Sequence, residues 1–297
     1  MISGCVDSLL AHMSARRQIA PSPGGTPPTR RIETPAGVVR VYDSGSNLPC
    51  VVMAPDGPNV IEHYAVLISL LSEKFRVVCF DMPGFGYSHP KPFYRHSLDQ
   101  GAHAILGVLR RLGIKRATLA FSCANGFYAL RAAKLAPRRI TNLVLSQTPS
   151  LSAMHAWTDR VIPRLLRVPV AGQVGAWLFR RKAAASWYGM ALPRTTEARC
   201  FREQALAALN TGACFCLAGV VQGLAKESIA SLQGTTVPCT MIWGDGDHSH
   251  RPTDPYSLHE CVPGADIVHF QDCGHFPDLE QPVRFARVLI EQGARYA

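Results

Sequence analysis

The run Arg116-Ala-Thr-Leu-Ala-Phe-Ser-Cys-Ala-Asn-Gly126 decides the fold that we expect for this sequence. Residues 117–121 are mostly apolar and predict a short buried strand. Small and polar residues follow at 122–126, and residues 127–135 have the apolar spacing of a helix. A strand, a tight turn and a helix together hold one turn residue out over the end of a sheet, where the opening amides of the helix can stabilise an anion. The sequence therefore predicts a reactive side chain at this turn, with Ser122 and Cys123 as the two candidates.

The rest of the chain alternates between short apolar strands and helices, except in one long segment. We expect strands at residues 31–34, 38–42, 50–54, 76–80, 142–146, 239–243 and 266–270, and helices near 60–72, 98–112, 255–261 and 282–293. From residue 148 to 234 only helical patches occur, interrupted by proline and glycine. This pattern predicts a mostly parallel, doubly wound α/β core over residues 31–147 and 235–297, with a helical lid at 148–234. The run of proline and glycine at 22–28 predicts that residues 1–30 form a flexible extension.

Composition excludes several classes of protein. Apolar residues make up 47% of the chain and charged residues 18%, which is typical of a globular protein and not of a disordered one. The net charge of +10 comes without a nucleic-acid-binding motif, so we expect no nucleic-acid partner. No apolar run is long enough for a membrane span, and the N-terminus is a poor signal peptide. Ten cysteines without a C-x-x-C pair favour reduced thiols, and hence a cytoplasmic protein.

Three motifs occur in a fixed order along the chain: D-x-P-G-x-G-x-S at residues 81–88, W-G-x-x-D at 243–247 and G-H-x-P-x-x-E-x-P at 274–282. Together with the turn at 122–126, they make residues 31–295 resemble the α/β-hydrolase superfamily. The resemblance implies that the lid is inserted after the sixth strand of the sheet. It also implies that the second and third motifs carry a catalytic acid and a catalytic histidine.

Two residues of these motifs suit the roles of base and orienting acid. His275 follows a Cys-Gly turn just past a strand end, and an imidazole there titrates near neutral pH. Asp247 also follows a strand and can orient this imidazole, with Asp245 as the competing carboxylate. His248 and His250 lie beside Asp247, but no third ligand accompanies them in the sequence, so we expect no metal site.

The spacing of the elbow motif and the steric needs of the turn favour different tip residues. The distances to the preceding helix and to the following Pro-Arg-Arg segment match the family without a gap when Cys123 is the tip. Small residues are favoured two positions before and after the tip, and Ser122 satisfies this, whereas Cys123 is flanked by Phe121 and Asn125. The two spacings favour Cys123, and Ser122 stays as the alternative. An aspartate tip would imply epoxide or haloalkane opening, so its absence argues against both reactions.

The family's H-G-x-P segment falls on residues 55–58, where the usual His-Gly is Pro-Asp. The resemblance then implies an oxyanion hole made by the backbone amides of Gly57 and Ala124. Asp56 brings an unexpected carboxylate to this hole. We expect it to point away and cap local backbone; pointing inward, it would oppose an oxyanion or position an amine or a water.

These residues predict a hydrolase or acyltransferase that attacks an ester or thioester through Cys123, His275 and Asp247. The substrate would be a small acyl compound, with an anionic or carrier-linked compound as one option. Residues 151–230 hold ten Lys and Arg against four Asp and Glu, which form either solvated helix faces or a pocket roof that attracts anionic substrates. The lid residues expected to line its pocket are Trp157, Trp177, Trp187, Tyr188 and Arg160. No cofactor is expected, and the oligomeric state is left open. Two alternatives remain, namely a non-hydrolytic ligand-binding protein and an ordinary esterase that uses Ser122.

Overall fold

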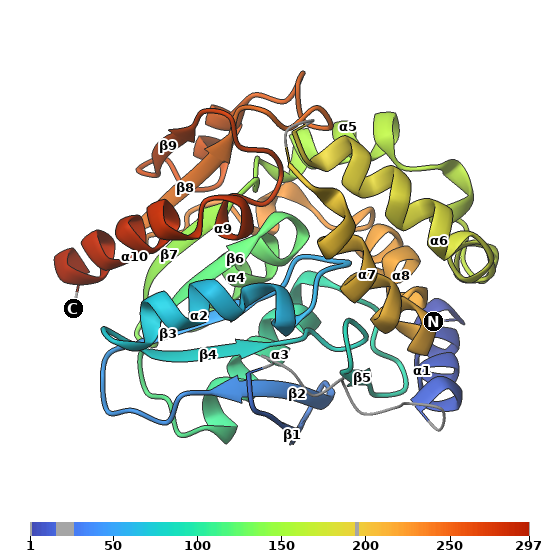
Figure 1. Cartoon of the computed structure of the whole chain (residues 1–297), viewed down its shortest axis with the longest axis horizontal. Helices are drawn as coiled ribbons and strands as arrows, with labels where there is room; N and C mark the ends of the chain where they lie inside the picture. The colour runs from blue at the N-terminus through green and yellow to red at the C-terminus, as the bar shows by residue number, and fades with distance from the viewer. Residues whose placement is uncertain (1, 16–26, 194–195, 297) are drawn as a thin grey trace.

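The computed structural model describes residues 2–15, 27–193 and 196–296, and at its centre lies one sheet (Figure 1). Its strands are β1 (Thr29–Thr34), β2 (Gly37–Asp43), β3 (Cys50–Ala54), β4 (Arg76–Phe80), β5 (His89–Pro90), β6 (Ala117–Ser122), β7 (Ile140–Ser146), β8 (Cys239–Gly244) and β9 (Asp266–Phe270). The order is β1-β2-β4-β3-β6-β7-β8-β9, with the short β5 paired to β2. The pairings of β2 are antiparallel and those from β4 to β9 are parallel. The predicted α/β-hydrolase fold is confirmed.

The central strands bring distant parts of the chain to one edge of the sheet. Strands β3 and β6 are almost continuously apolar and buried, as strands covered on both faces must be. Their register places Ala54 beside Phe121, and Ser122 lies beside Ser146 of β7. Because the carboxyl ends of parallel strands meet at one edge, residues 55–58, the turn after β6 and the loops after β7 and β8 are neighbours.

Helices cover both faces of the sheet (Figure 1). Helices α3 (Leu98–Arg111) and α4 (Cys123–Leu135) pack on one face, and their apolar residues join the larger core cluster. Helices α2 (Ala65–Ser72) and α10 (Pro282–Tyr296) pack on the other face. The remaining short elements of the core are η1 (Ile61–Tyr64), η5 (Pro255–Glu260) and α9 (Pro277–Glu280).

The chain between β7 and β8 forms a helical lid over one end of the sheet (Figure 1). It consists of α5 (Leu151–Val161), η2 (Arg164–Arg167), α6 (Ala171–Ala191), α7 (Ala198–Ala208), η3 (Leu209–Ala213), α8 (Phe215–Leu224) and η4 (Ile229–Ser231). If the two-residue β5 is set aside, β7 is the sixth strand in chain order, so the predicted insertion point is confirmed. In the described part of the chain no single helix could cross a membrane; only the sharply bent pair Ala198–Ala213 and Phe215–Leu224 has the length and composition for it.

The N-terminal segment differs from its prediction as a flexible extension. Residues Ile2–Ala15 form helix α1, which packs against the lid helix α8 and against β5. Asp7, Ser8 and Ala11 are buried, and the Ser8 hydroxyl donates a hydrogen bond to the Pro90 carbonyl. The run of proline and glycine is confined to residues 22–28 and does not include this helix. One face of the helix is covered by the lid. Residues 16–26, which were also part of the predicted extension, lie outside the described residues.

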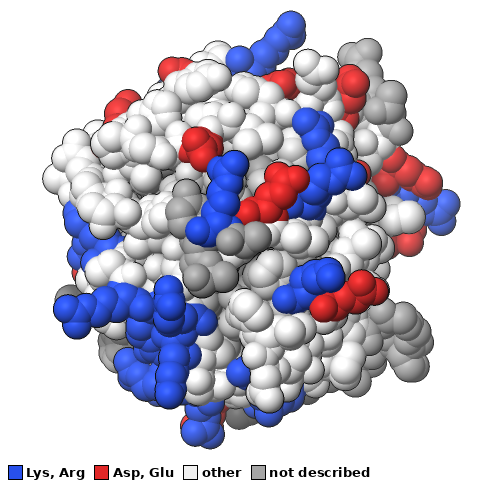
Figure 2. Space-filling model, turned by 90° about the vertical axis from the view of Figure 1, so that its left-hand side faces the viewer, with Lys and Arg blue, Asp and Glu red and all other residues white. Residues whose placement is uncertain are grey.

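Charged side chains are unevenly distributed on the surface. On the face drawn in Figure 2, Lys and Arg gather at the lower left, whereas elsewhere they lie beside Asp and Glu or among uncharged residues.

Candidate active site

The turn between β6 and α4 has the strained geometry of a reactive tip. Cys123 is the first residue of α4, and its φ of +49° lies in the left-handed region that a non-glycine residue rarely adopts. Such strain is found where a side chain is held out for function. The close contact behind the turn requires a glycine, because a Cβ at Gly126 would lie 2.2 Å from the Thr148 hydroxyl. Cys123 lines a cavity that is also lined by lid residues.

Ser122 faces a different environment. Its hydroxyl donates a 2.9 Å hydrogen bond to Oδ2 of Asp278, and the Tyr64 hydroxyl donates to the same oxygen at 2.7 Å. All three residues are buried, and none of them is among the cavity-lining residues. The two tip candidates are adjacent in sequence, but only the cysteine side chain reaches the cavity.

The structure accommodates the two large residues beside the turn. Phe121 is buried and packs edge-to-face on Phe80, with ring centroids 6.1 Å apart. The Asn125 amide donates a 2.9 Å hydrogen bond to the Pro55 carbonyl, so it ties the first turn of α4 to residues 55–58. The steric conflict expected from the sequence is resolved because both side chains find partners outside the turn.

His275 and Asp247 form a hydrogen-bonded pair at the carboxyl edge of the sheet. Asp247 Oδ2 lies 2.6 Å from His275 Nδ1, and the same oxygen accepts a 2.8 Å hydrogen bond from the Gln147 side chain. The other carboxylate oxygen accepts from the Ser249 amide at 2.8 Å. Gln147, which sequence reasoning missed, also accepts from the Gly244 amide through Oε1. Asp245, the competing carboxylate, instead lies 2.8 Å from Nδ1 of His269 and is half exposed.

Burial and neighbouring charges shift the pKa values of His275, Asp247 and Cys123 in opposite directions. Burial lowers the pKa of His275, but the Asp247 carboxylate and the Cys123 thiolate outweigh it, so the pKa of His275 lies well above its usual value. Burial would raise the pKa of Asp247, but the His275 charge and its hydrogen bonds hold that pKa below its usual range. Burial raises the pKa of the Cys123 thiol and the Asp56 carboxylate raises it further, while His275 and the Ala124 amide act against both.

Asp56 points into the site, which corrects the prediction that it points away. It is 4% exposed, lines the cavity, and its Oδ2 lies 3.3 Å from His275 Nε2. Burial raises the pKa of Asp56, and His275 together with the Gly57 amide partly reverses this. The Gly57 amide, a predicted oxyanion donor, therefore interacts with the carboxylate of its own neighbour. Gly57 itself is required by packing, since a Cβ there would lie 2.7 Å from Phe85.

His250 is a further buried residue at this site. Its ring stacks between Trp157 and His275, with centroid distances of 5.0 and 5.4 Å. One ring nitrogen of His250, one of His275 and the Cys123 sulfur all lie within 4.8 Å of one another. The sequence analysis expected no metal site because it found no third ligand beside His248 and His250. That premise is wrong, since Cys123 and His275 lie close to His250. The additional candidate ligands come from residues far away in the chain, which spacing along the sequence cannot reveal.

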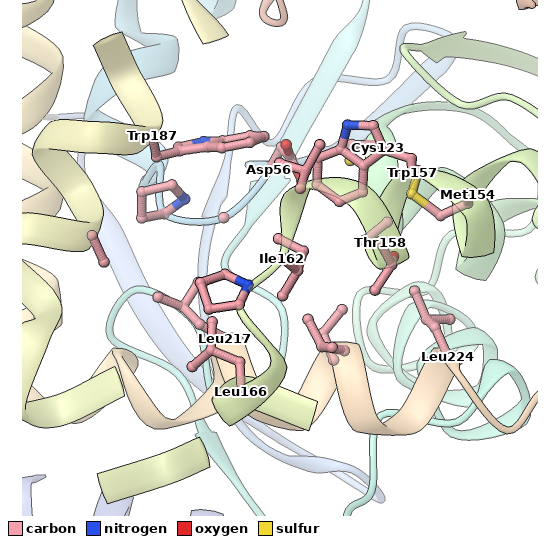
Figure 3. A pocket seen from close by; sticks show the side chains of 18 of the residues that line it. Asp56, Cys123, Met154, Trp157, Thr158, Ile162, Leu166, Trp187, Leu217 and Leu224 are labelled. Carbon is pink, nitrogen blue, oxygen red and sulfur yellow. The ribbon is translucent and has the colours of Figure 1, made fainter. Parts of the chain in front are cut away.

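A cavity of about 480 Å³ lies between the lid and the turn (Figure 3). Its wall is mostly apolar, and Trp157 and Trp187 belong to it as predicted. Trp187 also contacts His275 edge-on, with centroids 4.9 Å apart.

The other three predicted pocket residues lie outside this cavity, which corrects the prediction. Trp177 is 48% exposed, Arg160 is exposed, and Tyr188 is buried with its hydroxyl donating to the Asn59 side chain. Because successive helical residues are rotated by about 100°, Trp177 and Tyr188 project from other sides of α6 than Trp187 does.

Comparison with known proteins places the chain in a family. The sequence profile described as "Alpha/beta hydrolase family" matches residues 51–288. The chain belongs to the alpha/beta hydrolase family.

Individual relatives are more distant. Over 136 residues the chain is 32% identical to zearalenone hydrolase of Bionectria ochroleuca, a match that covers 44% of this chain and 51% of that protein. It thus spans about half the length of this relative. Uncharacterized protein Rv2715 of Mycobacterium tuberculosis is 21% identical over 92% of this chain and 84% of its own length. The crystal structure of epoxide hydrolase A from Mycobacterium thermoresistibile superposes with a TM-score of 0.74 at 17% identity, covering 90% of this chain and 98% of that one, which supports the fold alone.

Proposed function

We propose that this protein is an acyl-transfer hydrolase that attacks an ester or thioester of a small substrate with the thiol of Cys123. The observation that carries the proposal is the left-handed backbone of Cys123 at a cavity wall, next to an imidazole held by Asp247. A buried thiol close to a basic imidazole can be deprotonated and attack a carbonyl.

The reaction then runs in two steps. His275 takes the thiol proton, the sulfur bonds to the acyl carbon, and the alcohol or thiol leaving group departs with the proton from His275. Water or another nucleophile, deprotonated by His275, breaks the acyl-cysteine bond and releases the acid or the transfer product. The Ala124 amide, which lies beside the Cys123 sulfur, suits the role of oxyanion donor. Asp247 keeps the imidazole oriented and stabilises its cation.

The cavity favours a small, mostly apolar substrate. Its volume of about 480 Å³ lies within the range of sites for small molecules. Lid residues supply much of its wall, with Met154, Ile162, Leu166, Leu217 and Leu224 labelled beside Asp56 and Cys123 in Figure 3. Arg167 is a basic residue of the wall, but its guanidinium already donates to the Thr158 and Ile162 carbonyls and to Asp159. The wall therefore supports an apolar acyl group better than an anionic one.

Asp56 favours a second candidate function, a protein that binds a ligand in the cavity without turnover. Its carboxylate interacts with the Gly57 amide, so one of the two expected oxyanion donors is engaged before substrate arrives. The two candidates differ in whether an acyl group is ever transferred to the protein.

Turnover of a panel of p-nitrophenyl esters and acyl thioesters separates the candidates. We expect Cys123→Ala and His275→Ala each to lower kcat/KM by about a thousandfold or more, and Ser122→Ala to keep most of the activity. Cys200→Ala, at an exposed cysteine away from the cavity, is the matched control. Activity that survives Cys123→Ala but not Ser122→Ala would make the serine the nucleophile, and no turnover by the parent protein on any member of the panel would favour the binding protein.

A further inference from the structure

Unpartnered polar atoms gather beside the Cys123 thiol. Within the described residues, His250 Nε2, His275 Nε2 and Asp56 Oδ2 are buried and make no hydrogen bond, although the last two face each other at 3.3 Å. The three residues are 2%, 0% and 4% exposed, so bulk water does not supply the missing partners. Burying such groups without a partner is costly, and the triad chemistry accounts for only one of them, His275.

The four side chains offer a set of donors that suits one class of ligand. Imidazole nitrogen, thiolate sulfur and carboxylate oxygen are the groups that bind zinc in proteins. The backbone amides and hydroxyls that would recognise an organic anion are not among these atoms.

The surroundings of the two histidines leave one ring nitrogen of each without a hydrogen bond. Asp247 holds His275 Nδ1 at 2.6 Å, which leaves Nε2 as the free nitrogen, the arrangement that supports metal-bound histidines. His250 Nδ1 lies 3.3 Å from the Thr253 hydroxyl, and its Nε2 is again the free nitrogen. Stacking between Trp157 and His275 fixes the plane of the His250 ring.

The distances are close to those that a metal ion needs. The Cys123 sulfur and one nitrogen of each histidine lie within 4.8 Å of one another. Ligand atoms on one tetrahedral zinc lie about 3.3–3.6 Å apart. Small side-chain shifts therefore bring the donor atoms within coordinating distance of one ion. Asp56 Oδ2 is already 3.3 Å from His275 Nε2. The cavity that borders Asp56 and Cys123 provides the path of entry.

We propose that these four side chains form a binding site for zinc, and that the bound zinc inhibits the protein. Coordination requires the thiolate and neutral imidazoles, so the thiol proton and the proton that His275 carries on Nε2 when it is cationic are released to solvent, and no oxidation state changes. A thiolate bonded to zinc and an imidazole whose Nε2 is occupied cannot attack an acyl carbon or accept a proton. Removal of zinc restores both groups. The binding site follows from the geometry alone, whereas the inhibition rests on the proposed function.

The test is a titration of the chelator-treated protein with zinc chloride by calorimetry, and with cadmium chloride by ultraviolet absorption. We expect one equivalent to bind and a cadmium–thiolate charge-transfer band to appear. Cys123→Ser should abolish the band, and His250→Phe, which keeps the stacked ring but removes both nitrogens, should weaken zinc binding by about a hundredfold or more. His248→Ala, the exposed neighbouring histidine, and Cys200→Ser are matched controls that should bind like the parent.

Several results would overturn the site: no one-to-one binding by the parent, a cadmium band that survives Cys123→Ser, or parent-like affinity in His250→Phe. If His250→Phe does not fold by circular dichroism, Asp56→Asn takes its place and must weaken binding at least tenfold. Because binding is measured without a substrate, failure of the zinc site and failure of the proposed function are separate results. Zinc that binds but leaves ester turnover unchanged would overturn the inhibition alone.

Discussion

The two flanks of the His275 imidazole differ in how their carboxylates are satisfied. On the Nδ1 side, Asp247 pairs with the ring, with the Gln147 side chain and with the Ser249 amide. On the Nε2 side, Asp56 is equally buried, but its Oδ2 has no partner in hydrogen-bond geometry among the described residues. The first flank is a hydrogen-bonded support, of which the family's motif predicts Asp247 but not Gln147. On the second flank the carboxylate faces His275 Nε2 at 3.3 Å without hydrogen-bond geometry, so its hydrogen bonding is unsatisfied.

Removal of the charge on the supported flank should have the largest effect. Asp247→Asn leaves the shape of the side chain but no longer fixes the tautomer of His275, so we expect kcat/KM on the best ester to fall by about 10³–10⁴-fold. Steady-state kinetics measure this. Asp245→Asn, which lies away from the imidazole beside His269, should change the rate by less than about threefold. Equal effects of the two variants would contradict the assignment of the acid.

Asp7 of α1 is a buried carboxylate that lies away from the active site. Burial raises the pKa of Asp7 in α1 from 3.8 to about 7, against the effect of a hydrogen bond with Gln173. Between these two values the folded chain holds a proton that the unfolded chain has released, so the stability that Asp7 contributes falls as pH rises toward 7. Asp7→Asn removes this loss. We therefore compare the unfolding free energy of Asp7→Asn with that of the parent. We expect the difference, variant minus parent, to increase by about 2–3 kcal/mol between pH 5 and pH 8.

Urea unfolding at both pH values checks the prediction for Asp7. Asp266→Asn, an exposed aspartate on β9, should give the same difference from the parent at pH 5 and at pH 8. A constant difference for Asp7→Asn as well would show that the Asp7 carboxyl is not protonated in the folded chain near neutral pH.

The smallest effect is expected for the charge on the unsatisfied flank. The Asp56 carboxylate raises the pKa of the Cys123 thiol, second only to burial. In Asp56→Asn that pKa falls, and a larger fraction of the thiol is ionised at neutral pH. We expect iodoacetamide to alkylate Cys123 roughly threefold to tenfold faster than in the parent, as measured on the tryptic peptide 117–131. Slower alkylation would mean that Asp56 activates the thiol through His275.

The sequence predicted those features that depend on local pattern. The apolar strands, the order of motifs and the place of the lid are each visible within a short window, and the structure contains them. Helix α1 was missed because the run of proline and glycine at residues 22–28 suggested that everything before it was also linker. It packs on α8 and β5, and these contacts join distant parts of the chain.

Within the site, the sequence was least informative where side-chain direction decides. Adjacent residues Ser122 and Cys123 could be ranked by spacing, but only the hydrogen bond from Ser122 to Asp278 reveals where the serine points. The direction of Asp56 and the role of Gln147 in supporting Asp247 also depend on tertiary contacts. His250 reaches the site because the loop after β8 folds back between Trp157 and His275, and no spacing rule contains that information.

The central claim, that Cys123 is the nucleophile, is tested most directly by trapping the acyl group on the chain. The parent protein, Cys123→Ala and Ser122→Ala are each mixed with excess p-nitrophenyl ester, quenched in acid and measured by intact mass. Fragmentation of the tryptic peptide 117–131 then locates the added group. We predict one acyl group on Cys123 in the parent and in Ser122→Ala, released by neutral hydroxylamine as a thioester is, and none in Cys123→Ala. An acyl group on Ser122, or an adduct in peptide 117–131 that persists in Cys123→Ala, would contradict the account.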